Sequence, residues 1–383
     1  MPPQRQRRLR VYACANGEGK GAALVPDGES PLLDLASNDY LGLSRHPDVL
    51  AAAASELAAS GLGAGASRLV SGSRPVHQQL ERELAAWLGR ERLLLFPSGF
   101  QANLAAVAAL ADRHTIVLAD RLIHHSLLVG VSVSGAQLRR FPHNSLEHLA
   151  RSLEEVRCRE ACRRLLVLTE SIYSMEGSQA PLADLSALCN RYGAALLVDE
   201  AHALGLLGPG GRGLAHALEG PAVVSGTLGK AFGSGGAFLA ADGVVIEWLL
   251  QSSGAFRYTT ALAPPLAAGA LASLHWLQDQ ERRSQAPGLR LLERARRWRD
   301  GLEAAGWPRP AGDGPILPLR AGSDERALAL QAQLEKAGLL CVAIRPPTVP
   351  PGQARLRLVV RHNLPSGTLA RLLAALGPAP VTP

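Results

Sequence analysis

The stretch AALLVDEAH, residues 194–202, indicates a buried strand that ends in polar residues. Its apolar run is continuous rather than alternating, which is typical of a strand covered by helices on both faces of a parallel sheet. Asp199 follows the run directly, and His202 stands three residues later. Because functional groups collect beyond the carboxyl ends of parallel strands, this stretch predicts both a fold class and the position of a site.

Four further runs share this character, because each is predominantly apolar and bounded by Gly, Asp or Ser. They are TIVLAD (115–120), RLLVLTES (164–171), AVVSGTLGK (222–230) and GGAFLAA (235–241). Helical patterns such as SLEHLARSLEEVR and PLADLSALCNRYG separate some of them. The alternation predicts a large α/β domain with a mainly parallel sheet over residues 46–280, preceded by an N-terminal segment of residues 1–45.

The C-terminal part of the chain has a different pattern. A helical stretch over about 280–305 is followed by the short runs PILPLRA, LLCVAIRPP and ARLRLVV, with the helical pattern DERALALQAQLEKAG after the first of them. This arrangement predicts a smaller α+β domain over residues 281–383.

The composition of the 383 residues favours a folded globular protein, since 47% are hydrophobic and 19% are charged. No apolar run reaches the ~20 residues that a membrane-spanning helix needs, so we expect no association with a membrane. The five cysteines are odd in number and irregularly spaced, which argues against a disulfide framework and against a metal site. We therefore expect reduced cysteines in a cytoplasmic protein.

The N-terminus is basic. Arg5, Arg7, Arg8 and Arg10 precede the first acidic residue, Glu18, and the formal net charge of the chain is +7. Such a cluster fits a nucleic-acid-binding arm, a targeting peptide, a solvated segment or an arginine that binds an anionic substrate. The sequence has no nucleic-acid-binding motif and is only 4% aromatic, which leaves little stacking surface, so we expect no nucleic acid among the partners.

Lysine is rare in this chain, which makes each lysine informative. The 40 basic residues are arginines apart from Lys20, Lys230 and Lys336. Unlike arginine, lysine can become a neutral amine at working pH. Lys230 lies in GTLGKAFGSGG (226–236), whose spacing does not match a phosphate-binding P-loop, because Val224 stands where the first glycine would be required and Ala231 follows the lysine. Lys230 is therefore the candidate for amine chemistry.

Polar residues also follow the neighbouring apolar runs. Ser98-Gly99-Phe100 stand where a helix begins, and free backbone N–H groups at such a point suit a phosphate. Glu170 and Ser174 follow one strand, and Thr227 precedes Lys230 on another. A phosphate site, a strand-end aspartate and a reactive lysine match the requirements of pyridoxal phosphate, whose aldehyde reacts with an amine and whose ring nitrogen pairs with a carboxylate.

The chain resembles the α-oxoamine synthases, a family of fold-type I pyridoxal-phosphate-dependent transferases. The resemblance runs from about Asp34 to Leu358. It rests on SNDYLGL (37–43), GAGASRLVSG (63–72), DRLIHHSL (120–127), SMEGSQAPL (174–182), VDEAH (198–202), GTLGKAFG (226–233) and IRPPTVPPGQARLRL (344–358). It implies the fold of that class, with a large domain, a small C-terminal domain and active sites at the interface of a homodimer.

Matched motif by motif, the resemblance implies a set of cofactor contacts. Lys230 would form the Schiff base and act as the base at the substrate Cα, Asp199 would pair with the pyridine nitrogen, and His124 would stack on the ring. The other catalytic and cofactor contacts would come from hydroxyl, imidazole and backbone groups: His202 and Ser174 near the ring hydroxyl, Ser98, Gly99, Phe100 and Thr227 at the phosphate, and Thr260 at the phosphate of the neighbouring subunit.

The resemblance also implies a substrate pocket. Arg345 would bind the carboxylate of the amino acid, and Thr348, Asn38 and His124 would line the pocket. An N-terminal arginine would help bind the acyl substrate. Arg8 and Arg10 are both candidates, and we assign this contact to Arg8.

Within the family, the run IRPPTVP favours a member that condenses L-alanine with a pimeloyl thioester, carried by coenzyme A or an acyl carrier protein, with loss of carbon dioxide in biotin biosynthesis. Two alternatives stay open. One is a sister activity that uses glycine or serine, such as glycine C-acetyltransferase. The other is a non-catalytic binding protein on the same fold, against which the intact set of Lys230, Asp199 and His202 counts.

Overall fold

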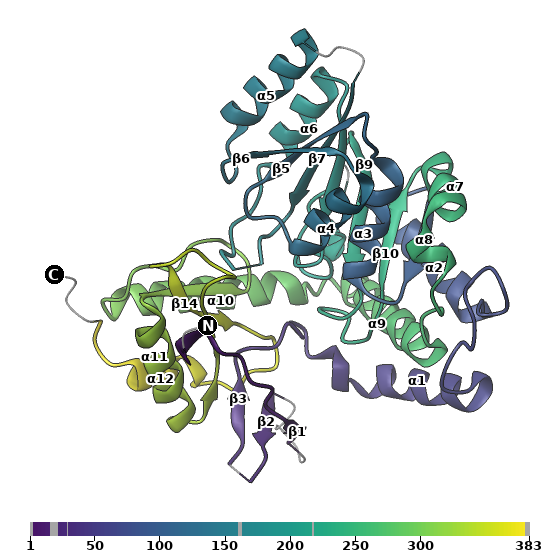
Figure 1. Cartoon of the computed structure of the whole chain (residues 1–383). Coiled ribbons are helices and arrows are strands. Elements are labelled where there is room, and N and C mark those ends of the chain that lie inside the picture. The colour runs from purple at the N-terminus through teal and green to yellow at the C-terminus, as the bar shows by residue number, and fades with distance from the viewer. Residues whose placement is uncertain (1–2, 16–21, 29, 160–162, 217, 380–383) are drawn as a thin grey trace. The chain divides into compact units, whose positions relative to one another are not determined.

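The computed structural model describes residues 3–15, 22–28, 30–159, 163–216 and 218–379. The chain divides into two compact units, unit 1 (Met1–Gly42, Ser174–Ser178 and Pro287–Pro383) and unit 2 (Leu43–Tyr173 and Gln179–Ala286). Each unit has its own sheet or sheets (Figure 1). The expected domain borders near residues 45 and 280 stay a prediction. Lys20 and Cys162 lie outside the described residues.

Unit 2 contains a seven-stranded sheet in the order β4-β10-β9-β8-β7-β5-β6. Its strands are β4 (Arg92–Phe96), β5 (Thr115–Asp120), β6 (Gln137–Phe141), β7 (Arg164–Glu170), β8 (Ala195–Asp199), β9 (Pro221–Thr227) and β10 (Ala237–Ala241). The pairs from β6 through β9 are parallel, and only β10 runs against its two neighbours. The predicted mainly parallel sheet is confirmed.

The helices of unit 2 supply the apolar surface that buries this sheet. They are η2 (Leu43–Arg45), α1 (Pro47–Ser60), α2 (Pro75–Leu88), α3 (Gly99–Leu110), α4 (His125–Ser134), α5 (Leu146–Arg159), α6 (Leu182–Arg191), η3 (Pro209–Gly211), α7 (Gly243–Ser252), α8 (Gly254–Arg257) and α9 (Pro264–Arg282). Helix α3 packs on α4 and contacts β4, β9 and β10. All six residues of β5 are buried, as expected for a strand covered on both faces.

A short loop, not a helix, joins β9 to β10, which is why β10 returns antiparallel to β9. Lys230 lies in this loop, three residues beyond the end of β9. The loop is closed by backbone hydrogen bonds, among them one from the Gly233 amide to the Lys230 carbonyl. Gly233 has a φ of +61°, and a Cβ there would lie 2.1 Å from the Ser44 amide nitrogen, so only glycine fits.

Unit 1 contains a four-stranded sheet, β1-β2-β3-β12, and a three-stranded sheet, β11-β14-β13. Its elements are η1 (Pro3–Arg5), β1 (Tyr12–Cys14), β2 (Ala23–Pro26), β3 (Leu32–Asp34), α10 (Pro287–Ala304), β11 (Ile316–Gly322), α11 (Asp324–Lys336), β12 (Leu339–Leu340), β13 (Val342–Ile344), β14 (Ala354–Val359) and α12 (Thr368–Leu376). The helix expected over about 280–305 is two helices, because α9 ends at Arg282, Ser284 adopts a φ of +52° and α10 begins at Pro287.

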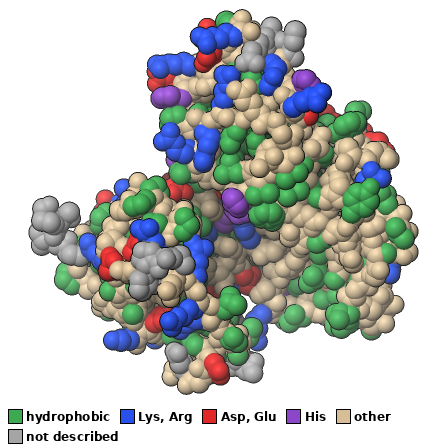
Figure 2. All heavy atoms as spheres, viewed as in Figure 1, with side chains coloured by type: hydrophobic (Ala, Val, Ile, Leu, Met, Phe, Trp, Pro, Cys, Tyr) green, Lys and Arg blue, Asp and Glu red, His purple; other side chains and the backbone are tan. Residues whose placement is uncertain are grey.

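Basic side chains are spread over the face shown in Figure 2, among hydrophobic and neutral ones. Among the described helices, none is both long enough and apolar enough to cross a membrane. Four of the five cysteines (Cys14, Cys158, Cys189 and Cys341) are described, and each carries a free thiol.

Candidate active site

The carboxyl ends of three neighbouring parallel strands place polar side chains in one row. Glu170 at the end of β7 is in register with Asp199 at the end of β8, and Asp199 is in register with Ser225 of β9. All three residues are buried. Because parallel strands end at the same edge of the sheet, the adjacency of β7, β8 and β9 brings the three side chains together.

The amine of Lys230 points toward His202. Its Nζ atom lies 2.9 Å from Nε2 of His202, and His202 is buried three residues after β8. The predicted spacing VDEAH therefore brings the imidazole to the lysine, while the strand holds Asp199. Lys230 itself is only partly buried, so its amine is accessible from the cavity described below.

The amino end of α3 forms the phosphate side of the predicted site. Ser98 caps the helix by accepting a 3.3 Å hydrogen bond from the Gln101 amide. A Cβ at Gly99 would be in ordinary contact, 3.7 Å from Cβ of Thr227, so glycine leaves open space beside this helix end. Thr227 Oγ1 lies within 3.2 Å of the Gly229 amide nitrogen. Backbone N–H groups at a helix start favour an anion.

A chain of hydrogen bonds joins Asp199 to His124 through two residues that the sequence interpretation did not identify. Asn103 Nδ2 donates to Asp199 Oδ2 over 2.7 Å and to Ser126 Oγ over 3.0 Å. Ser126 Oγ lies 2.7 Å from Nδ1 of His124, which caps the start of α4. The Ala201 amide holds the other oxygen of Asp199 at 2.9 Å. The orientation of both groups is therefore fixed within the protein.

Loss of hydration lowers the pKa of His124 below its ordinary value. The positive charges of Lys230 and His125 act in the same direction, and the negative charge of Asp199 opposes them. The His124 ring, which is exposed at the surface of the site, therefore favours its uncharged form more than a free imidazole does.

These groups surround one cavity of about 200 Å³ in unit 2. It is lined by Gly99, Phe100, Asn103, His124, Glu170, Asp199, Ala201, His202, Ser225, Gly226, Thr227 and Lys230. Of the predicted residues in this unit, seven line the cavity, Ser98 caps the adjacent helix, and Thr260 is exposed and outside the lining. An exposed Thr260 is compatible with the predicted contact to a neighbouring subunit, which stays a prediction.

The remaining predicted residues lie in unit 1, at two places. Arg8, Arg345 and Thr348 line a cavity of about 400 Å³ together with Arg5, Arg7 and Arg10. Within this cavity Arg7 Nη2 donates to Thr348 Oγ1 over 2.8 Å, and Arg345 donates to the backbone carbonyl of Gln4. The N-terminal segment thus supplies the arginines that the sequence analysis grouped together.

Asn38 and Ser174 are joined by a buried arginine that the sequence analysis did not assign. Arg357 Nη2 donates to Oδ1 of Asn38 over 3.0 Å, and its Nε donates to the Ser174 carbonyl over 2.9 Å. Arg357 is 7% exposed and lies on β14. Two arginines at alternate positions of a buried strand, ARLRL, are the signal that could have identified it, since a buried guanidinium needs polar partners.

The cavity of unit 2 fits a phosphorylated aromatic aldehyde in its donor set. It offers a carboxylate for a ring nitrogen, a helix start for a phosphate and an amine for a carbonyl carbon. Two buried polar atoms of its lining, Ser225 Oγ and Asn103 Oδ1, have no hydrogen-bond partner among the described residues, and such atoms suit a polar ligand. Among the described residues, no group of three or more His, Cys, Asp or Glu side chains is placed to hold a metal ion.

A family model for aminotransferase class I and II matches residues 30–376. The chain belongs to this family. Its curated relatives in the family include 8-amino-7-oxononanoate synthases from Acidithiobacillus ferrooxidans strain ATCC 53993, with 43% identity over 92% of this chain and 89% of the relative, and from Stutzerimonas stutzeri, with 44% identity over 93% and 90%.

Solved structures in the same family share the fold. A serine palmitoyltransferase from S. paucimobilis with a bound PLP–myriocin aldimine superposes with a TM-score of 0.89 at 28% identity, covering 96% of this chain and 91% of that one. An 8-amino-7-oxononanoate synthase from Francisella tularensis has a TM-score of 0.74 at 27% identity, covering 90% and 96%. The predicted fold class, a fold-type I transferase with a parallel-rich sheet, is confirmed, as is the resemblance to this group of enzymes.

Proposed function

We propose that this protein is a pyridoxal-phosphate-dependent 8-amino-7-oxononanoate synthase. It would condense L-alanine with a pimeloyl thioester, of coenzyme A or an acyl carrier protein, to give 8-amino-7-oxononanoate, carbon dioxide and the free thiol in biotin biosynthesis. The observation that carries the choice of reaction is the identity of 41–44% to curated synthases of that name over at least nine-tenths of the chain. The cavity of unit 2 supplies the groups that this chemistry requires.

The cofactor would be held by residues that line or adjoin that cavity. The backbone N–H groups of Gly99 and Phe100 at the start of α3, helped by Ser98 and Thr227, would bind the phosphate. Asp199 would accept a hydrogen bond from the pyridine nitrogen, because Asn103 and the Ala201 amide already hold its carboxylate in place. When bound, pyridoxal phosphate supplies an electrophilic carbonyl carbon and a ring that stabilises negative charge on the substrate Cα.

Lys230 would supply the amine and would move the proton at the substrate Cα. A neutral Nζ is needed for both tasks, and His202 at 2.9 Å is placed to accept or return a proton. His124, whose pKa is lowered chiefly by loss of hydration, would cover the face of the ring. His202 and Ser174 would orient the ring hydroxyl.

Guanidinium groups of unit 1 would bind the carboxylates of the substrates. A bidentate guanidinium suits a carboxylate, and the sequence interpretation assigns this task for L-alanine to Arg345, with Thr348 and Asn38 beside the substrate. Arg357 is a second candidate, since it already contacts Asn38 and the backbone of Ser174. Arg8 would serve the acyl substrate, because it lies among the arginines that line the cavity of about 400 Å³.

A homodimer is part of this proposal. Large apolar side chains are exposed in two neighbouring parts of unit 2, namely Leu62, Leu69 and Val70 in one loop and Tyr258 beside Thr260. The backbone links these segments, since the Ala261 amide donates to the Ala66 carbonyl over 3.0 Å. Burial of such side chains against a second copy would stabilise a dimer. We also propose a cytoplasmic location, in keeping with the free thiols of the described cysteines.

A serine- or glycine-using sister activity is the second candidate, and one observation favours it. Serine palmitoyltransferases superpose with TM-scores up to 0.89, above the 0.74 of the synthase from Francisella tularensis. Sequence identity points the other way, at 28–29% for these transferases against 41–44% for the curated synthases. Backbone similarity reports the shared fold, while side chains of the pocket select the substrate, so identity has more weight here.

The test is a product assay with the purified protein loaded with pyridoxal phosphate. L-Alanine, glycine and L-serine are each paired with pimeloyl-, acetyl- and palmitoyl-coenzyme A, and the products are identified by mass spectrometry. The proposal predicts that alanine with the pimeloyl thioester is the preferred pair by at least about tenfold in kcat/KM. Preference for serine with the palmitoyl thioester, or for glycine with the acetyl thioester, would move the protein to a sister activity.

A further inference from the structure

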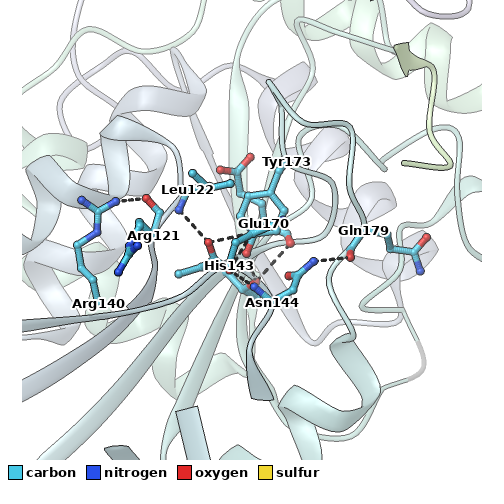
Figure 3. Close-up of polar contacts among 10 residues, drawn as sticks. Arg121, Leu122, Arg140, His143, Asn144, Glu170, Tyr173 and Gln179 are labelled. Atoms are coloured by element: carbon cyan, nitrogen blue, oxygen red, sulfur yellow. Dashed lines mark hydrogen bonds and ion pairs between the residues drawn. The ribbon is translucent and has the colours of Figure 1, made fainter. Parts of the chain in front are cut away.

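A second cluster of polar groups lies at the same edge of the sheet as the active site, outside its cavity lining. Its centre is Asp120, the last residue of β5, which is 1% exposed. Nδ1 of His143 lies 3.1 Å from both carboxylate oxygens. The Leu122 amide donates to Oδ1 and the Asn144 amide to Oδ2, each over 2.8 Å. Figure 3 shows Leu122, His143, Asn144 and Tyr173 gathered at this point.

The donors keep this buried carboxylate ionised. Burial would raise the pKa of Asp120, but the hydrogen bonds from His143 and from the Asn144 and Leu122 amides hold the pKa below its ordinary value. Burial and the charge of Asp120 raise the pKa of Tyr173, whose hydroxyl lies 2.9 Å from Oγ1 of Thr169. Burial of a charged group costs free energy, which hydrogen-bond donors must offset. The donors around Asp120 thereby fix the backbone segments to which they belong.

The residues around Asp120 come from three different strand ends. Leu122 follows β5, His143 and Asn144 follow β6, and Tyr173 follows β7. The rings of His143 and Tyr173 pack edge to face with centroids 4.4 Å apart. Asp120 therefore joins the segments that follow β5 and β6 beside the active-site cavity, and Tyr173 packs on His143 from the segment that follows β7.

One of these segments carries His124. The Asp120 carboxylate holds the Leu122 amide, and the Asp120 carbonyl accepts from the Ile123 amide over 3.4 Å. His124 follows immediately, and its ring is held from the other side by Ser126 Oγ at 2.7 Å. The position of the His124 ring thus depends on Asp120 on one side and on Ser126 on the other.

We propose that Asp120, bonded to the Leu122 and Asn144 amides and in contact with His143, is a positioning residue that sets the turn of residues 121–123 and so holds the His124 ring at the cavity. This inference rests on the proposed function only in that His124 faces the bound cofactor. Asp120 touches neither substrate nor cofactor, and acts through the backbone of the turn. It predicts that loss of the carboxylate releases this turn first and weakens cofactor binding as a consequence.

Asp112 provides a control in the turn that precedes the same strand. It caps the turn that enters β5, where its Oδ1 accepts from the His114 amide over 2.8 Å, and it pairs with Arg164. The two aspartates thus make similar turn contacts at opposite ends of β5. The Asp112 turn is far from the cavity lining in the sheet, because it lies at the amino end of the strand.

The experiment compares Asp120→Asn, Asp120→Ala and His143→Gln with Asp112→Asn and Asp112→Ala. Hydrogen–deuterium exchange of a peptide spanning residues 121–126 is measured without added cofactor, and the Kd and induced circular dichroism of pyridoxal phosphate are measured with it. We expect the Asp120 variants to exchange about tenfold faster in this peptide, from loss of charge-assisted hydrogen bonds. We expect their Kd for the cofactor to rise about 10- to 100-fold, with altered dichroism.

His143→Gln should shift both readouts in the same direction by less, since the two amides remain as donors to Asp120. The Asp112 variants should leave both readouts unchanged. Unchanged exchange in residues 121–126 for Asp120→Asn and His143→Gln, or equal effects of the Asp112 variants, would overturn the inference. If Asp120→Ala does not fold, Asp120→Asn and His143→Gln still test the inference. A wild-type protein that binds no pyridoxal phosphate would refute the proposed function, while the exchange measurement would still test the turn.

Discussion

Asn103 holds Asp199 by a 2.7 Å hydrogen bond from Nδ2 to Oδ2, although 96 residues separate them in the chain. The same amide nitrogen holds Ser126. We expect Asn103→Leu to lower kcat about 10- to 100-fold, because Asp199 and Ser126 lose their common donor. Asn190→Leu is the control, since Asn190 is exposed and its side chain donates to the Glu219 carbonyl over 3.4 Å. Equal kcat values for the two variants would contradict the assigned role.

Lys230 is the residue on which the proposed chemistry depends most directly. Lys230→Ala should reduce product formation by about 10²- to 10⁴-fold, because the group that moves the proton is lost. Lys230→Arg should be equally impaired, since a guanidinium stays protonated. Lys336→Ala, at the exposed end of α11, should behave as wild type. Turnover within tenfold of wild type in Lys230→Ala would rule out the proposed role of this amine.

Arg357 and Arg345 can be distinguished by steady-state kinetics with varied L-alanine. We expect Arg357→Gln to raise the KM for L-alanine by about 10- to 100-fold, because a charge-assisted contact to the carboxylate is lost. We expect Arg345→Gln to act more on the KM for the pimeloyl thioester, since Arg345 lines a cavity with Arg8 and its arginine neighbours. The opposite pattern would return the amino-acid carboxylate to Arg345, as the sequence interpretation has it.

Glu200 predicts a pH dependence of stability. Burial raises its pKa to about 7, the charge of Asp199 adds to this, and hydrogen bonds from Ser171 and backbone amides oppose it. The unfolded chain releases this proton near pH 4.3, so between about pH 4.3 and 7 the folded state binds more protons. The free energy of unfolding should therefore fall as pH rises through this window, by at most about 1.4 kcal/mol per pH unit from this group.

Glu200→Gln removes that contribution, because an amide does not titrate. Urea unfolding at pH 5, 6, 7 and 8 would measure it: the stability of wild type relative to Glu200→Gln should be highest at pH 5 and lowest at pH 8. Parallel stability curves for the two proteins would show that the raised pKa is not real.

A buried ion-pair cluster in unit 1 joins the segment around Asp34 to the segment around Arg361. Arg361 Nη1 lies 2.7 Å from Asp34 Oδ2, and Nη2 lies 3.1 Å from Asp39 Oδ2. The side chains of Arg361 and Asp34 are 4% and 2% exposed. Arg361→Met removes the cation beside the buried carboxylate of Asp34, so we expect a loss of about 3–5 kcal/mol in the free energy of unfolding.

Arg297→Met is the comparison for this prediction, since Arg297 pairs with Glu293 on the exposed face of α10. Its cost should be within about 1 kcal/mol. Equal losses in urea unfolding for the two variants would mean that burial of the Arg361 pair does not matter.

The parts of the molecule that follow from local pattern were predictable from the sequence. TIVLAD coincides with β5, and the apolar run before Asp199 gives β8, because a continuous apolar stretch between helices is specific for a buried parallel strand. Residues that the sequence placed at strand ends, such as Asp199 and Lys230, line one cavity because parallel strands end at one edge.

What could not be predicted depends on pairing between distant residues. Asn103 looks like any polar residue in a helix, and only the packing of α3 beside β8 gives it Asp199 as a partner. Its spacing of four residues from Gly99, which puts both on one helix face, was the available signal. The direction of β10 was also missed, since the length of the loop after Lys230 decides it and the apolar pattern does not.

The parallel pairing of β3 with β12 has a consequence for synthesis on the ribosome. Leu33 lies opposite Leu339, and the Leu33 amide donates to the Gly338 carbonyl, so strands β1 to β3 complete their sheet only after Leu340 has emerged. Unit 2 is encoded in between and has all of its own strands available earlier. At about 5–20 residues per second, the apolar N-terminal strands are without their partner strand for many seconds. Their apolar surface is exposed during this time and is a binding site for chaperones.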